Sequence, residues 1–231
     1  MKINFLLLLL FFTMKTATSY ASDPISRRYT DHYYQRLNQF AEEPAIRSND
    51  IVMLGNSLTE RGGDWCERLN QKNIRNRGII GDEVMGVYDR LGEILAGHPH
   101  KLFLLIGIND VSHDLSTDSI VNLIRMTVER IQHDSPTTKL YLQSLLPINE
   151  SFDRYKKLTG KTAMIPEINI GLKKLARKEK ISYIDLFPLF TEKGTNVLQS
   201  NLTDDGLHLN DEGYKIWTKV LKKKLRRTKN R

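Results

Sequence analysis

Ser57, Asp205 and His208 are residue types that together can cleave an ester by nucleophilic attack. A serine hydroxyl is a weak nucleophile and needs a base within hydrogen-bonding reach. His208 is the best candidate base, because an imidazole titrates near neutral pH. Asp205 precedes it by three residues, on a turn that contains Gly206, and can accept the Nδ1 proton and so fix the tautomer. Asp204 is an alternative to Asp205 that lies one residue further from the histidine.

Donors for the oxyanion of a tetrahedral intermediate are also present. We expect the backbone N–H groups of Ser57 and Gly81 and the side-chain amide of Asn109 to supply them. A glycine suits position 81, because a Cβ atom would crowd the approach of the backbone to a substrate. Taken singly, a serine after a strand is usually a helix cap, and an Asn or an Asp-Gly pair is usually a turn former. Only the ordered combination of these segments indicates a catalytic site.

Most of these polar segments follow short runs rich in β-forming residues. The runs are 51–54, 74–76, 102–106, 140–142 and 181–184, and the third is apolar on both faces. Between them lie helical patterns, of which the clearest has apolar residues at helical spacing from Ile120 to Ile131, with Ser116 or Thr117 as its N-cap. Strands that alternate with helices predict a three-layer α/β/α sandwich around a central, mainly parallel five-stranded sheet. The polar segments would then meet at the C-terminal edge of that sheet.

A long connection, residues 147–165, follows the fourth predicted strand. Connections of this length are uncommon without a function, so we expect it to shape the substrate site, and it is a candidate lid. Gln143, Ser144 and Asn149 lie at or near its start and are candidate substrate-binding residues.

The polar segments resemble, in sequence and in order, the motif blocks of the SGNH hydrolases, the GDSL family of esterases and lipases. They are residues 55–58 (Gly-Asn-Ser-Leu), 76–82, 107–110 (Gly-Ile-Asn-Asp) and 204–208. The resemblance spans residues 51–214 and implies a flavodoxin-like SGNH fold. It also implies a catalytic triad of Ser57, Asp205 and His208, an oxyanion hole of Ser57, Gly81 and Asn109, and no metal or organic cofactor. The most similar branch contains the platelet-activating-factor acetylhydrolases and the bacterial carbohydrate acetylesterases.

The sequence departs from the family motif at Asn56, where the motif has an aspartate. That aspartate is regarded as structural in the family. An isosteric amide is therefore expected to keep the shape of the turn, lose a charge and alter the local hydrogen bonding. The absence of a Gly-x-Ser-x-Gly sequence around Ser57 argues against the α/β-hydrolase fold.

The first 21 residues have the pattern of a cleavable signal peptide. Lys2 precedes an unbroken apolar run, residues 5–12, and Ser19-Tyr20-Ala21 matches a cleavage site, with the cut expected after Ala21. The run is shorter than the ~20 apolar residues of a transmembrane helix, and an uncleaved N-terminal anchor is the alternative. We therefore expect a secreted or periplasmic protein with one hydrolase domain over residues 22–231.

The chain has 231 residues, 40% of them hydrophobic, and a formal net charge of +8. This composition excludes collagen, coiled-coil, polytopic membrane and disordered classes. Much of the positive charge lies in a basic C-terminal tail, residues 222–231, which is interpreted as the solvated end of the last helix. Weak contact of the tail with an anionic surface is the alternative, and nucleic acid is disfavoured as a partner. The single cysteine, Cys66, excludes an internal disulfide and a Cys-rich zinc module, and no pattern indicates an oligomeric state.

Together these features predict an exported serine esterase that hydrolyses a short-chain acyl ester, with acetyl on a carbohydrate as the favoured substrate. Its partner would be a small-molecule or carbohydrate ester. A lysophospholipase or short-chain lipid esterase is the alternative within the same chemistry. A catalytically silent carbohydrate-binding module on the same fold is the alternative from a different class.

Overall fold

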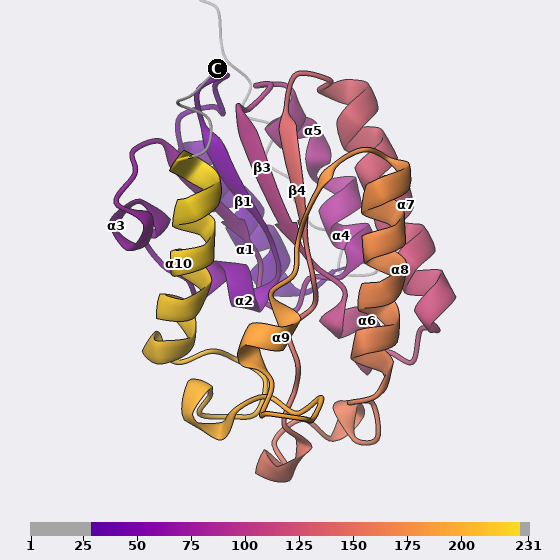
Figure 1. Cartoon of the computed structure of the whole chain (residues 1–231). Helices are drawn as coiled ribbons and strands as arrows, with labels where there is room; N and C mark the ends of the chain where they lie inside the picture. The colour runs from indigo at the N-terminus through magenta and orange to yellow at the C-terminus, as the bar shows by residue number, and fades with distance from the viewer. Residues whose placement is uncertain (1–28, 227–231) are drawn as a thin grey trace, which may run out of the picture.

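Five parallel β-strands form the central sheet of the structure, a computed structural model that describes residues 29–226 (Figure 1). The strands are β1 (Ile51–Gly55), β2 (Ile74–Gly78), β3 (Lys101–Leu105), β4 (Lys139–Gln143) and β5 (Ser182–Ile184). Their order is β2-β1-β3-β4-β5, and every neighbouring pair is parallel. The predicted flavodoxin-like sheet is confirmed. The predicted signal peptide, residues 1–21, and the end of the basic tail, residues 227–231, lie outside the described residues.

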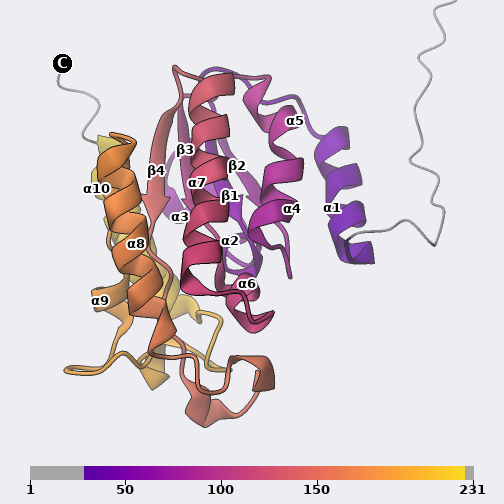
Figure 2. The same cartoon turned by 90° about the vertical axis from the view of Figure 1, so that its right-hand side faces the viewer.

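Helices cover both faces of the sheet (Figures 1 and 2). One face packs against α4 (Val84–Asp89), α5 (Leu91–Leu95), α7 (Thr117–Asp134) and α8 (Met164–Lys178). The other packs against α2 (Ser57–Glu60), α3 (Trp65–Leu69), α9 (Phe187–Phe190) and α10 (Asp211–Arg226). Within β1, Val52 and Leu54 belong to the first core, and Ile51 and Met53 belong to the second. A parallel sheet buried on both faces needs apolar residues on both, which explains the continuous apolar runs in the sequence.

The long helix α7 begins where the sequence predicts it. Ser116 is its N-cap, and the Ser116 Oγ accepts a hydrogen bond of 3.2 Å from the backbone N–H of Ser119. The buried stripe of the helix includes Ile120, Ile124 and Ile131. The cap and the apolar spacing therefore place this helix without any tertiary information.

Helix α1 (Asp31–Glu42) is a helix that the sequence pattern does not predict. It lies beside α4 and the β2 edge of the sheet, where Tyr33 and Phe40 pack with Ile79 (Figure 2). These two aromatic residues are the only buried side chains of α1. So sparse an apolar stripe does not stand out in the sequence.

The connection over residues 147–165 forms a closed loop beneath the C-terminal edge of the sheet. It contains two short 3-10 turns, η1 (Glu150–Phe152) and η2 (Lys156–Leu158), before α8 begins at Met164. The Glu150 carboxylate closes the loop by accepting hydrogen bonds from the backbone N–H groups of Gly160, Lys161 and Thr162. The two remaining short helices are α6 (Ile108–Ser112), after β3, and η3 (Ser200–Leu202). Over residues 29–226, no helix has both the length and the apolar character needed to cross a bilayer.

Candidate active site

Ser57, His208 and Asp205 are joined by hydrogen bonds at the C-terminal edge of the sheet. Ser57 is the first residue of α2, directly after β1, and its Oγ lies 2.9 Å from His208 Nε2. On the other side of the ring, His208 Nδ1 lies 2.7 Å from Asp205 Oδ2. With Nδ1 protonated, the ring donates to the carboxylate, and Nε2 is left to accept the serine proton. Residues that are 151 positions apart in sequence are thus in direct contact.

The Asp205 carboxylate is held in place by its own turn. Asp205 Oδ1 accepts hydrogen bonds from the backbone N–H groups of Leu207 (3.0 Å) and His208 (2.7 Å). Burial alone would raise the pKa of Asp205, but these bonds, together with those from the His208 and Tyr155 side chains, lower it to about 2. The carboxylate is therefore ionised at any working pH. The structure places Asp205, and not Asp204, on the histidine.

The His208 side chain is buried, and this burial sets its charge. Loss of solvation lowers the pKa of His208 below its ordinary value, and the hydrogen bond and charge of Asp205 only partly oppose this shift. The neutral ring, the form that can act as a base, is therefore the resting form at neutral pH.

The pH profile of kcat/KM should report this shift. With His208 as the base, kcat/KM is expected to rise with pH through the lowered pKa and to pass half-maximum below about pH 6.5, the ordinary value for histidine. The measurement is p-nitrophenyl acetate hydrolysis from about pH 5 to about pH 8 at constant ionic strength. A half-maximum at or above about pH 7 would contradict this assignment.

The three expected oxyanion donors lie around one cavity with the nucleophile. Ser57, Gly81, Asn109 and His208 all line a cavity of about 410 Å³. Asn109 Nδ2 donates one hydrogen bond, of 2.8 Å, to the backbone carbonyl of Asp82, and an amide nitrogen carries a second hydrogen for a ligand. Gly81 has φ of +80°, a left-handed conformation that favours glycine. A Cβ at position 81 would meet no protein atom within 4 Å, so no crowding by the protein requires a glycine there. The positive φ angle is what favours it.

Two buried aspartates support the segments that carry these donors. Asp110, on α6, accepts hydrogen bonds from the backbone N–H of Val84, which ties α6 to the start of α4. Asp82 pairs with Arg90 at 2.9 Å, and Arg90 also donates to the backbone carbonyl of Gly55. Burial raises the pKa of Asp110 to about 7, and that of Asp82 to about 6 against the opposing charge of Arg90. No local pattern in the sequence indicates these supports, because the groups that they join lie on different segments of the chain.

Asn56 keeps the turn that precedes Ser57. Its Oδ1 accepts a 3.1 Å hydrogen bond from the backbone N–H of Leu58 and caps α2. Its Nδ2 is buried and has no hydrogen-bond partner among the residues that the structure describes. Asn56 Oδ1 thus supplies the same kind of capping acceptor as a carboxylate oxygen of the motif aspartate. The change in local hydrogen bonding is that the other carboxylate oxygen is replaced by an NH₂ group.

The candidate substrate-binding residues Gln143, Ser144 and Asn149 lie outside the lining of the catalytic cavity. Gln143 and Ser144 are fully buried: Gln143 Oε1 accepts from the Trp217 indole N–H, and Ser144 Oγ accepts from the backbone N–H groups that begin α9. Asn149 lines a small neighbouring pocket, and its Nδ2 donates to the Leu198 carbonyl. The structure therefore gives all three a hydrogen bond within the fold and brings none of them to Ser57.

Tyr155 is a site residue that the sequence analysis does not identify. Its hydroxyl donates a 2.8 Å hydrogen bond to Asp205 Oδ2 and lies 2.9 Å from His208 Nδ1. Burial and the bond to Asp205 raise the pKa of Tyr155 to about 12, so the hydroxyl stays protonated as a donor. The partners of Tyr155 are about 50 residues away in sequence, so no local pattern identifies it. The one signal in the sequence is its place in the long connection over residues 147–165.

Within residues 29–226, no cluster of three or more His, Cys, Asp or Glu side chains is arranged to hold a metal ion.

Comparisons with known proteins place the chain in a family. The model of the GDSL-like lipase/acylhydrolase family matches residues 53–216. No curated protein matches the sequence significantly. Among solved structures, a protein from Streptococcus pneumonia, provisionally described as a platelet activating factor, is 27% identical, with 84% of this chain and 91% of that chain covered and a TM-score of 0.72.

Two further solved structures show the same fold at lower identity. A GDSL-like lipase from Bacteroides thetaiotaomicron is 20% identical, with 85% of this chain and 98% of that chain covered and a TM-score of 0.75. An acetyl xylan esterase is 22% identical, with 76% and 99% covered and a TM-score of 0.63. At these identities the likeness is one of fold.

Proposed function

The chain belongs to the GDSL-like lipase/acylhydrolase family and is an ester hydrolase with the SGNH fold, and from this premise we propose that Ser57, His208 and Asp205 are its catalytic triad. The observation that carries the proposal is the continuous hydrogen-bonded chain from Ser57 Oγ through the His208 ring to the Asp205 carboxylate. Ser57 and His208 line the same cavity as Gly81 and Asn109.

The proposed reaction is acyl transfer in two steps. Ser57 Oγ attacks the ester carbonyl while His208 Nε2 takes the hydroxyl proton, and the carbonyl oxygen becomes an oxyanion. The backbone N–H groups of Ser57 and Gly81 and the Asn109 amide donate hydrogen bonds to that oxyanion. As the C–O bond breaks, protonated His208 gives its proton to the leaving alcohol. A water molecule then attacks the acyl-enzyme with His208 as base, which releases the acid and restores Ser57.

A short acyl group, with acetyl on a carbohydrate favoured, is the proposed substrate. The apolar side chains in the cavity lining are Ile80, Leu158 and Leu207, which offer a small apolar surface rather than a channel for a long chain. The likeness in fold to an acetyl xylan esterase supports the same class. Export is part of the proposal and rests on the leader pattern in residues 1–21, and N-terminal sequencing of the mature protein checks for a cut after Ala21.

Hydrolysis of p-nitrophenyl acetate, butyrate and octanoate tests this proposal. We expect kcat/KM for acetate to exceed that for octanoate by about tenfold or more, because the lining has few apolar side chains against which the longer chain could be buried. A rise in turnover with chain length would instead favour the lysophospholipase or lipid-esterase alternative. Turnover of none of the three esters would contradict the proposal, and retained sugar binding would then indicate the silent carbohydrate-binding module.

A further inference from the structure

The lining of the catalytic cavity contains cations but no carboxylate. Arg154, Lys156 and Lys157 lie in this lining together with Ser57 and His208. Lys156 forms an ion pair with Asp153, its neighbour on the same turn. Arg154 and Lys157 are exposed and have no ion-pair partner among residues 29–226. Their charges are therefore available to a ligand that enters the cavity.

These cations belong to the site, because the loop that carries them is fixed against the triad. Tyr155 lies between Arg154 and Lys156, and its hydroxyl contacts both Asp205 and His208. The Glu150 carboxylate closes the same loop through three backbone N–H groups. The hydrogen bonds of Tyr155 and Glu150 thus fix the backbone that carries Arg154 and Lys157 beside the cavity.

A further cation, Arg61, approaches the site from the end of α2, four residues after Ser57. Its positive charge contributes to the lowering of the pKa of His208, and together with Arg154 it opposes the rise in the pKa of Tyr155. Arg61 lines an adjacent depression with Asp204, but it forms no ion pair within the described residues. Positive potential therefore reaches the catalytic side chains from two elements that are distant in sequence.

Acidic groups near the cavity cancel only part of this charge. The Asp205 carboxylate is ionised, and the hydrogen bonds from its own turn, from His208 and from Tyr155 hold it without neutralising it, so it offsets one cation. Asp204 is exposed beside Arg61 and offsets a second. Asp153 is neutralised by Lys156, and Asp114 is paired with Lys161. A cleft with an excess of one sign of charge raises the local concentration of ligands of the opposite sign.

We propose that the substrate is an ester whose alcohol portion carries a negative charge, and that Arg154 and Lys157, with support from Arg61, select for it. This inference rests on the proposed esterase function with a short acyl group. A short acyl group such as acetyl is uncharged, so a charge that the cations attract must lie on the alcohol portion of the ester. A carboxylate or a phosphate would supply the same charge. Because these cations are exposed, their attraction for a substrate is moderate and is screened by salt.

Matched substrates separate charge from shape. The probes are 4-acetoxybenzoate and 4-acetoxyphenyl phosphate, which carry an anion on the alcohol portion, and 4-acetoxybenzamide, which is neutral and close in shape. The readout is the ratio of kcat/KM for each anionic ester to that for the neutral ester. We expect this ratio to fall as sodium chloride is raised from about 10 mM to about 500 mM, because salt screens the exposed cations. The carboxylate and phosphate arms show which anion the site prefers.

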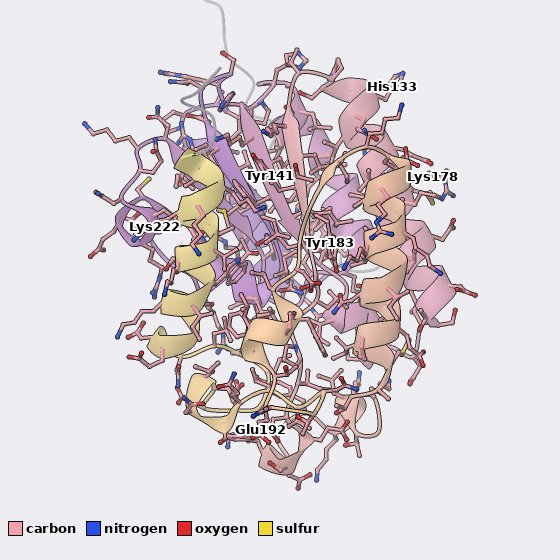
Figure 3. All side chains as sticks on the ribbon, viewed as in Figure 1. His133, Tyr141, Lys178, Tyr183, Glu192 and Lys222 are labelled. Atoms are coloured by element: carbon pink, nitrogen blue, oxygen red, sulfur yellow. The ribbon has the colours of Figure 1, made fainter. Side chains whose placement is uncertain are left out.

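Neutralising the cations should lower this ratio. In an Arg154→Gln, Lys157→Gln double variant the ratio is expected to fall about four- to twentyfold at low salt, and the change should appear mainly in KM, because the cations attract substrate and transition state alike. Dividing each variant's ratio by the wild-type ratio cancels the intrinsic reactivities of the esters. Lys178→Gln is the matched control, because Lys178 is exposed at the end of α8, close to the edge where the strands begin (Figure 3).

The outcomes distinguish this inference from the function on which it rests. A lowered ratio in the double variant, with the ratio of Lys178→Gln unchanged, supports the inference. A ratio within about twofold of wild type in the double variant overturns it, even if the wild-type enzyme prefers anions. Turnover of p-nitrophenyl acetate that survives Ser57→Ala would overturn the proposed function instead, whatever the ratio.

Discussion

Replacing Ser57 with alanine is expected to lower kcat/KM for p-nitrophenyl acetate by about a thousandfold or more without unfolding the protein. The Ser57 hydroxyl is bonded to His208 Nε2 and to no other group in residues 29–226. The cap of α2 is Asn56, so the helix does not depend on the serine side chain. The substitution therefore removes the nucleophile and leaves the local fold in place.

A matched serine variant makes this result specific. Ser48 is exposed in the turn that precedes β1, close to the edge of the sheet where the strands begin, and Ser48→Ala should retain wild-type turnover. The thermal unfolding of both variants is compared by circular dichroism. If Ser57→Ala kept more than about a tenth of wild-type activity, Ser57 would not be the nucleophile.

The second large effect is expected at Asn109. Asn109→Ala should lower kcat by about a hundredfold or more and leave KM within about threefold, because an oxyanion donor acts in the transition state rather than on bound substrate. Asn109 lines the catalytic cavity, and its bond to the Asp82 carbonyl fixes the orientation of the amide. The measurement is steady-state hydrolysis of p-nitrophenyl acetate.

Asn122→Ala is the control for this variant, since Asn122 is exposed on α7 and lies outside the cavity lining. A thermal melt of Asn109→Ala separates a loss of the fold from a loss of the donor. A fall in kcat of less than about threefold, or a rise in KM with kcat unchanged, would remove Asn109 from the proposed oxyanion hole.

Two residues at the end of β4 show what sequence position does not determine. Gln143 and Ser144 lie at the catalytic edge of the sheet, a position that suggests substrate contact. Their polar atoms instead accept hydrogen bonds from Trp217 and from the start of α9. The position of a residue in the sequence predicts that it lies at the edge of the sheet. It does not predict which way the side chain points at the end of the strand.

Local patterns in the sequence determined the architecture and the sheet edge at which the candidate site lies. Short runs rich in β-forming residues placed all five strands within two residues of their observed bounds, and the spacing from Ile120 to Ile131 with Ser116 as cap placed α7. These signals are short-range, because strand burial and helix periodicity involve residues only a few positions apart. The same sheet topology then required Ser57 and Asn109 to meet at one edge.

Only the tertiary structure decided the contacts between distant segments. It chose Asp205 over Asp204 as the partner of His208, brought Tyr155 to both of them, and placed Arg154 and Lys157 in the cavity lining. Each of these outcomes depends on how a loop packs against a segment about 50 residues or more away. Side-chain contacts over such separations leave no periodic trace in the sequence, because they are set by the packing of whole elements.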